Sequence, residues 1–332
     1  MDQPTVAEIG ELELLKRLQP FCAVGQLGDD AAVLSPSALA SVVTTDVLVD
    51  GVHFSDRTTS PEDIGWRAIA ANLSDLAAMG AAPMGVTVGL AVPGSMPVAW
   101  IEQVYQGMAA CLQTHGGQII GGDLTRSPQP MVAITALGQV APQRGIYRDR
   151  AQPGQVIVAT GWHGCSRAGL ELLSGSPAHQ QGLSEAAASF IQAHQRPVPR
   201  GDVVAHFAAW SDADIATVAG MDSSDGLANA VLWLCQASGV GATLQRSRLP
   251  MPPALRSCVG EKMALDWCLY GGEDFELVLC LSADLALELL VKLGDRAAMI
   301  GTVEVGSAVL LVDDVGDEPD LTLTWESCFQ HF

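Results

Sequence analysis

Hydrophobic and polar positions in the first half of the chain alternate between strand-like and helix-like patterns. The β-branched run Ser41–Asp46 predicts a strand that ends in an acid. Ser60 and Pro61 then supply an N-cap and a first-turn proline, which predict the start of a helix that Gly80 ends. The alternation continues with a strand over Ala81–Val92, a helix over Pro97–His115 and a strand over Met131–Val140. This pattern predicts an α+β fold with α/β layers.

The composition changes over Ala141–Gly154, which is rich in Pro, Gly and Arg and is the best candidate for an interdomain linker. The pattern then starts again, with strands expected over Val156–Thr160, Ala216–Met221, Phe275–Leu281 and Met299–Val305, and helices over Ser174–Arg196 and Leu227–Ala237. Because 332 residues exceed what one core usually holds, we expect two domains, 1–146 and 147–332.

The chain is strongly acidic, with a formal net charge of −20 and only three lysines. A nucleic-acid or anionic-membrane partner is therefore disfavoured, because both need a basic surface. Two explanations of the charge stay open at this point. The protein is either an ordinary acidic soluble protein, or part of its charge is neutralised by bound cations.

The spacing of the cysteines and the composition of residues 1–10 indicate a cytoplasmic protein. The eight cysteines form no CxxC pair and no zinc-ligand spacing, so neither zinc nor a disulfide framework is expected. Residues 1–10 contain acids and no basic segment, which does not fit a signal peptide. Apolar runs such as Ala81–Pro93 are too short, and too interrupted by Gly and Pro, to span a bilayer.

Aspartates cluster in short stretches rich in Gly, Ser and Thr, at the expected ends of strands. Five such clusters are present: Gly28-Asp29-Asp30, Thr44-Thr45-Asp46, Gly121-Gly122-Asp123, Asp222-Ser223-Ser224-Asp225-Gly226 and Gly271-Gly272-Glu273-Asp274. Any one of them is explained by local turn preference. Five in one chain favour converging carboxylates, which would repel one another unless cations held them. Because these ligands are oxygens without clustered His or Cys, they indicate Mg²⁺, Mn²⁺ or Ca²⁺.

Asp75 lies close to the C-terminal end of the helix that Gly80 is expected to terminate. A carboxylate in this position opposes the helix dipole by a few tenths to ~1 kcal/mol. Asn72 lies on the same helix face, three residues earlier. Asp75 is thus either an exposed surface acid or a ligand whose bound cation offsets this cost.

A Mg²⁺ ion held by carboxylates most commonly bridges protein acids and the phosphates of a nucleotide. The usual phosphate-binding motifs are missing from the sequence, which has no Walker A, GxGxxG or protein-kinase motif. Phosphates would then be held by Mg²⁺, backbone amides and a few arginines, with Arg148, Arg150 and the turn Gly161–Ser166 as candidates. The two arginines are equally well explained as solvating the linker.

Together these motifs resemble the thiamine-monophosphate kinase family, within the superfamily that includes aminoimidazole ribonucleotide synthetase and selenophosphate synthetase. The matching stretches run in family order from residue 28 to the end: 28–33, 44–54, 71–80, 121–123, 196–200, 221–227, 271–277 and 329–332. Each is weak alone, and the combination is specific. Leu124, Gln155 and Trp162-His163-Gly164-Cys165 depart from the family pattern, which affects details of nucleotide contact rather than the reaction.

The resemblance implies a homodimeric enzyme that uses ATP to phosphorylate thiamine monophosphate to thiamine diphosphate. The dimer core would be an N-terminal mixed sheet with helices, followed by a C-terminal α+β sandwich. The implied ligands of several Mg²⁺ ions are Asp30, Thr44, Thr45, Asp46, Asp75, Asp123, Asp222 and Asp225. The implied nucleotide contacts are Gly122, Asp123, Arg148 and Ser224, and the implied substrate contacts are His53, Glu273 and Phe329, with Trp325 as the alternative aromatic residue.

A phosphate nucleophile is already ionised near neutral pH, so the reaction needs no strong general base. We therefore expect direct in-line transfer without a phospho-enzyme, and no single dominant acid–base residue. Selenophosphate synthetase is disfavoured because Cys22 has apolar neighbours and its nearest lysine is Lys16. A hypothesis of another class is a sensor that binds Mg·ATP without turnover and forms no ADP when thiamine monophosphate is added.

Overall fold

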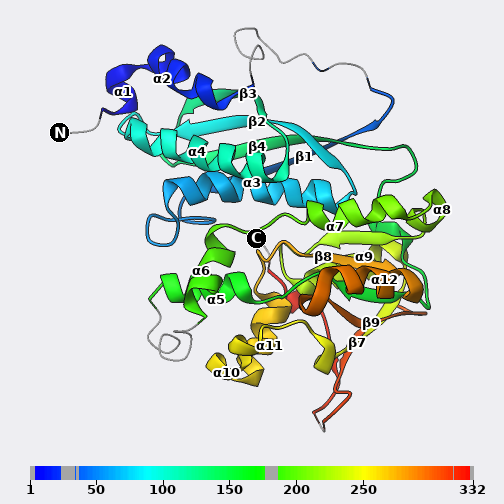
Figure 1. Cartoon of the computed structure of the whole chain (residues 1–332). Coiled ribbons are helices and arrows are strands. Elements are labelled where there is room, and N and C mark those ends of the chain that lie inside the picture. Colours follow the sequence, from blue (N-terminus) through cyan, green and yellow to red (C-terminus); the bar gives the residue numbers. More distant parts are fainter. Residues whose placement is uncertain (1–3, 24–33, 35–36, 176–185, 317, 330–332) are drawn as a thin grey trace. The chain divides into compact units, whose positions relative to one another are not determined.

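A computed structural model describes residues 4–23, 34, 37–175, 186–316 and 318–329 of the chain (Figure 1). The chain divides into two compact units, the first made of Met1–Leu76 and Ala81–Ala141 and the second of Ala77–Gly80 and Pro142–Phe332. The chain thus enters the second unit inside the segment expected to be a linker. The domain limits at residues 146 and 147 remain a prediction.

The first unit contains a four-stranded sheet in the order β1-β4-β2-β3. Its strands are β1 (Ala40–Val49), β2 (Ala82–Val92), β3 (Ile119–Arg126) and β4 (Met131–Val140). β4 pairs antiparallel with both β1 and β2, whereas β2 and β3 run parallel, so the sheet is mixed, as expected. Its helices are α1 (Val6–Ile9), α2 (Glu11–Leu18), α3 (Pro61–Ala78) and α4 (Val98–His115), with a 3₁₀ turn η1 (Gln19–Phe21).

One face of this sheet and the helices α3 and α4 form the core of the first unit. β4 shows the alternation directly, because Val132, Ile134 and Ala136 are buried while the residues between them are only half-buried. The two helices pack closely at glycines: a Cβ on Gly65 would lie 1.9 Å from the carbonyl oxygen of Val104. A larger residue at this crossing would force the helices apart.

The second unit contains a seven-stranded sheet in the order β11-β10-β7-β9-β5-β8-β6. The strands are β5 (Val156–Ala159), β6 (Ala219–Asp222), β7 (Gly241–Gln245), β8 (Leu277–Leu281), β9 (Ala298–Glu304), β10 (Val309–Val312) and β11 (Leu321–Thr322). The longer helices are α5 (Cys165–Leu173), α6 (Ala187–Gln195), α9 (Leu227–Ser238), α11 (Glu261–Tyr270) and α12 (Ala283–Leu293). Shorter ones are α7 (Gly201–His206), α8 (Asp212–Ile215) and α10 (Pro253–Val259), with 3₁₀ turns η2 (Arg148–Arg150), η3 (Phe207–Ala209), η4 (Arg246–Arg248), η5 (Gly294–Arg296) and η6 (Trp325–Ser327).

Both faces of the central strands in this second sheet are covered. Along β8, Val278 and Cys280 belong to one core with α9 and α11, while Leu277, Leu279 and Leu281 belong to another with α7 and α12. Burial on both faces explains why β8 is apolar at every position rather than alternating. The sandwich of helices and sheet expected for the C-terminal half is confirmed.

Most of the expected strands and helices are present, with two corrections that concern the acidic clusters. β1 does not end at Asp46 but continues to Val49, because the β-branched pattern resumes after the acid. Gly121-Gly122-Asp123 lies inside β3 and is not a turn. The regular helix expected over 174–196 is seen only as α6, and residues 176–185 lie outside the described part. In the described part of the chain, no helix is both long and apolar enough to cross a membrane.

Candidate active-site residues

Thr44, Asp46 and Asp75 meet where β1 faces α3. Alternate residues of a strand point to one face, so Thr44 and Asp46 share the face on which Leu48 is buried. The Thr44 hydroxyl donates a short hydrogen bond to a carboxylate oxygen of Asp75 on α3. The structure therefore brings Thr44 and Asp75 into contact, with Asp46 on the same face of β1 as Thr44, and Asp75 is not an isolated surface acid.

Asn72 fixes the distance between the same strand and helix. Its side chain is fully buried, and its amide nitrogen donates to the carbonyl of Ala68 at 2.9 Å. The amide oxygen is thereby turned toward β1, where it accepts from the backbone N–H of Asp46 at 3.1 Å. β1 is an edge strand, so Asn72 satisfies a backbone donor that this edge would otherwise leave unpaired. Asn72 thus positions Asp46.

Thr45 and Asp123 lie on the opposite face of the same sheet. The register pairs Asp123 with Gly89, Gly89 with Ala133 and Ala133 with Val47, so Asp123 shares the face of Thr45 and Val47. β1 and β3 are the two edges of the sheet, and two intervening strands separate them by about 14 Å. Within a single copy of the first unit, Asp123 is therefore not beside Asp46 and Asp75.

Gly122 has a structural reason to be glycine. A Cβ at this position would lie 2.3 Å from the carbonyl oxygen of Val88 on the neighbouring strand β2.

His53 also has a structural role, since its Nδ1 accepts a hydrogen bond from the backbone N–H of Val49 at 3.1 Å. That bond assigns any proton of the neutral ring to Nε2.

The acidic turn Asp222–Gly226 connects β6 to α9 in the second unit. Asp222 ends the strand and is buried, with 3% of its surface exposed. Gly226 has φ +102°, and a Cβ there would approach the carbonyl oxygen of Leu269 to 2.7 Å. The turn therefore requires glycine at its last position and presents Ser224 and Asp225 at the start of a buried helix.

Glu273 is held against this turn by an unusual backbone. Glu273 and Phe275 both have left-handed conformations, with φ of 58° and 51°, which non-glycine residues rarely adopt. The Glu273 N–H donates to the carbonyl of Ser224 at 2.6 Å. Backbone strain of this kind costs about 1–3 kcal/mol per residue and is concentrated at functional sites. The observation supports Glu273 as a functional residue.

Asp274 binds backbone amides of the turn Gly161–Ser166, which we expected to bind phosphate. Its carboxylate accepts from the N–H groups of Gly164 and Ser166 at 2.7 and 2.8 Å, at the N-terminus of α5. Burial raises the pKa of Asp274 to about 7, against the lowering effect of these amide bonds. The expectation that Gly161–Ser166 cradles phosphate is therefore corrected, because an internal carboxylate already occupies the turn.

An ion pair that the sequence did not indicate joins Arg200 and Glu276, whose side chains are only 12% and 16% exposed. Glu276 accepts from the Thr160 hydroxyl at 2.7 Å and forms a short ion pair with Arg200, which also holds Asp202 by two bonds of 2.9 Å. Burial raises the pKa of Glu276 although Arg200 opposes the shift. Gly161 leaves room for this carboxylate, since a Cβ there would lie 2.1 Å from it. The only sequence signal was that Arg200 and Glu276 each lie in a family motif.

His163 connects its own turn to the acidic turn. It is fully buried, with Nδ1 3.0 Å from the carbonyl oxygen of Gly161 and Nε2 3.0 Å from the Ser223 hydroxyl. Burial lowers the pKa of His163 to about 4, although the bond to Gly161 acts in the opposite direction. In a neutral ring that donates from Nδ1, Nε2 is an acceptor that faces the Ser223 hydroxyl, and this hydroxyl also donates to the Glu276 carbonyl at 3.1 Å. His163 therefore positions the residue between Asp222 and Ser224.

This burial predicts a pH dependence of stability. The pKa of His163 is about 4 in the folded chain and 6.5 in the reference state, so the unfolded chain binds the proton first as the pH falls. The stabilisation is complete above pH 6.5 and is lost as the pH falls toward 4. Between pH 7.5 and 5, the free energy of unfolding of the wild type should fall by about 2 kcal/mol more than that of His163→Gln. Urea unfolding at both pH values measures this, and parallel pH profiles would show that His163 does not titrate as described.

The two aromatic residues near the C-terminus, Trp325 and Phe329, differ in exposure. Trp325 packs edge-on against Trp233, with ring centroids 4.8 Å apart, whereas Phe329 is 51% exposed. Asp225 contributes to raising the pKa of Cys328, after the larger effect of burial, so the C-terminal segment lies near the acidic turn. Of the two aromatics, Phe329 is the more accessible.

Arg148 is exposed, while Arg150 lies over the Tyr147 ring and bonds to Gly145.

The expected metal ligands are thus divided between the two units. Thr44, Thr45, Asp46, Asp75 and Asp123 lie in the first, Asp222 and Asp225 in the second, and Asp30 lies outside the described residues. Within the part of the chain that the structure describes, no three His, Cys, Asp or Glu side chains form a metal-binding group. The groups that do meet are all oxygens, which suits Mg²⁺ rather than zinc.

Sequence comparison relates the whole chain to known enzymes. Residues 28–140 match the family of AIR synthase related proteins, N-terminal domain. The thiamine-monophosphate kinase of Synechococcus elongatus is 49% identical over 100% of this chain and 99% of its own length. That of Prochlorococcus marinus is 38% identical and covers 92% of both chains.

Structural comparison gives the same relatives. The thiamine-monophosphate kinase structure from Stenotrophomonas maltophilia is 34% identical, with a TM-score of 0.77 over 92% of this chain and 96% of its own. The structure of AaThiL complexed with AMPPCP and TMP is 29% identical, with a TM-score of 0.72 over 97% and 99% of the two chains. Hydrogenase maturation protein HypE from E. coli has a TM-score of 0.78 over 95% of this chain and 97% of its own, but is only 20% identical, which shows a shared fold alone.

Proposed function

The chain belongs to the thiamine-monophosphate kinase family, and we propose that it transfers the γ-phosphoryl group of ATP to thiamine monophosphate at aspartate-held Mg²⁺. The products are thiamine diphosphate and ADP. The structural observation that carries the proposal is the pair of bonds between β1 and α3, which join Thr44 to Asp75 and the Asp46 backbone to Asn72. The eight free thiols support a reducing compartment, and we propose the cytoplasm.

Mg²⁺ would be held in the first unit by Asp46 and Asp75 with Thr44, and in the second unit by Asp222 and Asp225. We also propose Asp30, Thr45 and Asp123 as ligands, on the basis of the family motifs. When bound, Mg²⁺ supplies positive charge that lets two anionic phosphate groups approach. The Asp46 backbone is fixed by Asn72, and the acidic turn is fixed by His163 and Gly226. The protein thus contributes preorganised oxygens.

The chain's own residues orient the reactants and need not take up a proton. An oxygen of the thiamine monophosphate phosphate attacks the γ-phosphorus, and the bond from that phosphorus to the bridging oxygen of ADP breaks. The nucleophile is already an anion at neutral pH, so no single acid–base residue dominates. We propose nucleotide contacts at Gly122, Asp123, Arg148 and Ser224. We propose substrate contacts at His53, Glu273 and Phe329, the last by stacking on a ring.

We further propose that the chain forms a homodimer through the face of the first sheet opposite α3 and α4. Val43 and Val47 project from β1 on this face and are 61% and 45% exposed. Exposed apolar side chains in a row along a strand are typical of an interface. Thr45 and Asp123 lie on the same face, so pairing through it would bring further proposed ligands to the interface.

Replacing Val43 and Val47 by Lys should convert the dimer to a monomer, because four buried charges would be placed in its interface. Sedimentation velocity measures the mass of the wild type and the variant. Val291→Lys is the matched control, since Val291 is 85% exposed on α12 and lies on a different unit. A monomeric wild type, or a double variant that remains dimeric, would rule out this interface.

The activity itself is tested by incubating the purified chain with ATP, Mg²⁺ and thiamine monophosphate. We expect equal amounts of ADP and thiamine diphosphate, and no product when EDTA removes the metal. Chromatography of the products distinguishes this from a sensor, which would bind ATP without turnover. Binding of ATP with no thiamine diphosphate formed would exclude the kinase.

A further inference from the structure

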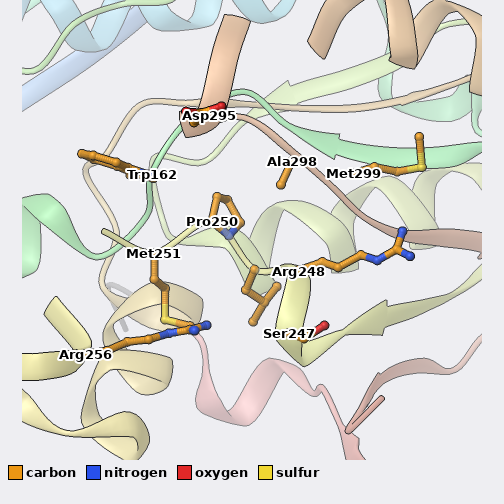
Figure 2. Close-up of a pocket in the computed structure, with 10 residues that line it drawn as sticks. Trp162, Ser247, Arg248, Pro250, Met251, Arg256, Asp295, Ala298 and Met299 are labelled. Carbon is orange, nitrogen blue, oxygen red and sulfur yellow. The ribbon is translucent and has the colours of Figure 1, made fainter. Parts of the chain in front are cut away.

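A pocket of about 490 Å³ lies within the second unit, and none of the residues that line it is assigned to the reaction (Figure 2). Its walls come from η4 and the residues that follow it, from α10, from η5 and from the start of β9. Trp162, just before His163, closes one side. A volume of this size suits a small molecule rather than a single ion.

Six of the ten residues that line this pocket are hydrophobic: Trp162, Leu249, Pro250, Met251, Ala298 and Met299. Leu249, Pro250 and Met251 are buried and form its floor. Trp162 adds an aromatic ring, and the guanidinium of Arg296 lies 4.8 Å from the centre of that ring. Arg296 thus covers part of the ring, and Trp162 and Pro250 are the flat side chains of the lining that a ring-shaped ligand would contact.

The rim carries positive charge, which is uncommon in this chain. Of the 17 basic residues, three are lysines and 14 are arginines, and four of these arginines lie on the segments around the pocket: Arg246, Arg248, Arg256 and Arg296. The opposing acids are Asp295 on the rim, Glu261, which is 3.7 Å from Arg256, and Asp314, which is bonded to Ser247. Arginines outnumber acids here, although the whole chain has a net charge of −20.

Arg256, which lines the pocket, has a donor that is not used within the described chain, as does Arg246 beside the lining. The buried Nε atoms of Arg246 and Arg256 have no hydrogen-bond partner among the described residues. Arg248 and Arg256 both line the pocket, and Figure 2 shows the Arg256 side chain extending toward Met251. Guanidinium groups bind phosphate by paired hydrogen bonds.

We propose that this pocket is a second binding site, for a small phosphorylated ring compound. The phosphate groups bind to Arg248 and Arg256, and the ring lies against Trp162 and Pro250. An unphosphorylated ring would make no hydrogen bonds to the two arginines, and a free phosphate would make no contact with the Trp162 ring.

The pocket is connected to the acidic turn by hydrogen bonds. The carbonyl of Pro250 on its floor accepts from the backbone N–H of His163 at 2.9 Å. His163 in turn contacts the Ser223 hydroxyl at 3.0 Å. A ligand that displaces Trp162 or Pro250 therefore acts on the segment that positions Ser223, and its occupancy changes turnover. This effect on turnover rests on the proposed function, whereas binding to the pocket does not.

Equilibrium dialysis in EDTA tests binding, because the pocket needs no metal. The probes are AMP and thiamine diphosphate, which carry different rings, and inorganic phosphate, which has none. We expect a ring-bearing probe to bind at one equivalent per chain and at least tenfold more tightly than phosphate. Arg248→Ala combined with Arg256→Ala should weaken it at least tenfold, and Trp162→Leu should weaken it toward the affinity of phosphate.

Two controls separate the pocket from the reaction site. Lys292→Ala removes one positive charge from α12, outside the pocket lining, and Asp75→Asn alters the proposed metal site; both should bind the probe as the wild type does. Binding that the arginine substitutions leave unchanged, or that Asp75→Asn abolishes, would overturn the proposal. Circular dichroism checks the fold of each variant, and the arginine pair suffices if Trp162→Leu does not fold.

Steady-state kinetics test the effect on turnover. AMP that competes with ATP at the reaction site changes only the apparent KM, whereas AMP in the pocket changes kcat. We expect AMP to change kcat of the wild type and not that of the Arg248→Ala/Arg256→Ala variant. An unchanged kcat in the wild type at AMP concentrations that fill the pocket would refute this effect. If AMP binds to the pocket but the wild type forms no thiamine diphosphate in any assay, the proposed kinase activity is refuted and the second binding site is not.

Discussion

Asp75→Asn is expected to lower kcat/KM for thiamine monophosphate by at least about 10³-fold, or roughly 4 kcal/mol, while the chain remains folded. The asparagine keeps an oxygen that accepts the Thr44 hydrogen bond, so the contact between α3 and β1 is retained. It removes the negative charge that we propose binds Mg²⁺, and a neutral amide binds this ion much more weakly. The rate should recover little when more Mg²⁺ is added.

Glu102→Gln is the matched control for this prediction. Glu102 lies on α4 in the same unit and contacts Arg17 at 3.5 Å near the surface, so its charge should not affect turnover. Coupled detection of ADP gives the rates, and urea unfolding shows whether the two variants are equally stable. Wild-type turnover in Asp75→Asn would mean that the carboxylate only accepts the Thr44 bond.

Arg200→Met should cost about 3–5 kcal/mol of folding stability, because it leaves Glu276 buried without its partner cation. Burial already raises the pKa of Glu276 in the presence of Arg200, which means that desolvation of this carboxylate outweighs its ion pair. Loss of the arginine also removes the bond to the Thr160 carbonyl at 2.9 Å. Urea unfolding at pH 7.5 measures the loss.

Adding Glu276→Gln to Arg200→Met should restore at least half of the lost stability, since the double variant no longer buries a charge. Lys292→Met provides the comparison, because its pair with Glu288 is an exposed contact of two residues four apart on α12 and should contribute less than ~1 kcal/mol. Equal losses in the single and double variants would show that the charge on Glu276 is not the reason for the cost.

The Arg200–Glu276 pair also illustrates what sequence patterns do not contain. The two residues are 76 positions apart, and Thr160 and His163 come from yet another segment. Neither periodicity nor turn preference relates such positions, because both describe residues only a few places apart. A fold has to bring them together before their charges interact.

Local signals, in contrast, predicted local structure well. Ser60 caps α3 as expected, accepting from the Asp63 N–H at 3.2 Å, and Gly80 ends that helix with φ +71°. The strand expected over residues 131–140 is β4, with both limits correct. The strand ends were less reliable around the acids, because an Asp within β1 or β3 has the same neighbours as an Asp in a turn.

The sequence by itself determined the residue types of the candidate site, the family, and the strands and helices on which those residues lie. Only the tertiary structure decided their partners. It places Asp75 beside Thr44, puts Asp46 and Asp123 on opposite faces of one sheet, and gives the amides of Gly164 and Ser166 to Asp274. The physical reason is range: backbone preferences act over a few residues, whereas strand order, burial and electrostatic pairing are properties of the folded chain.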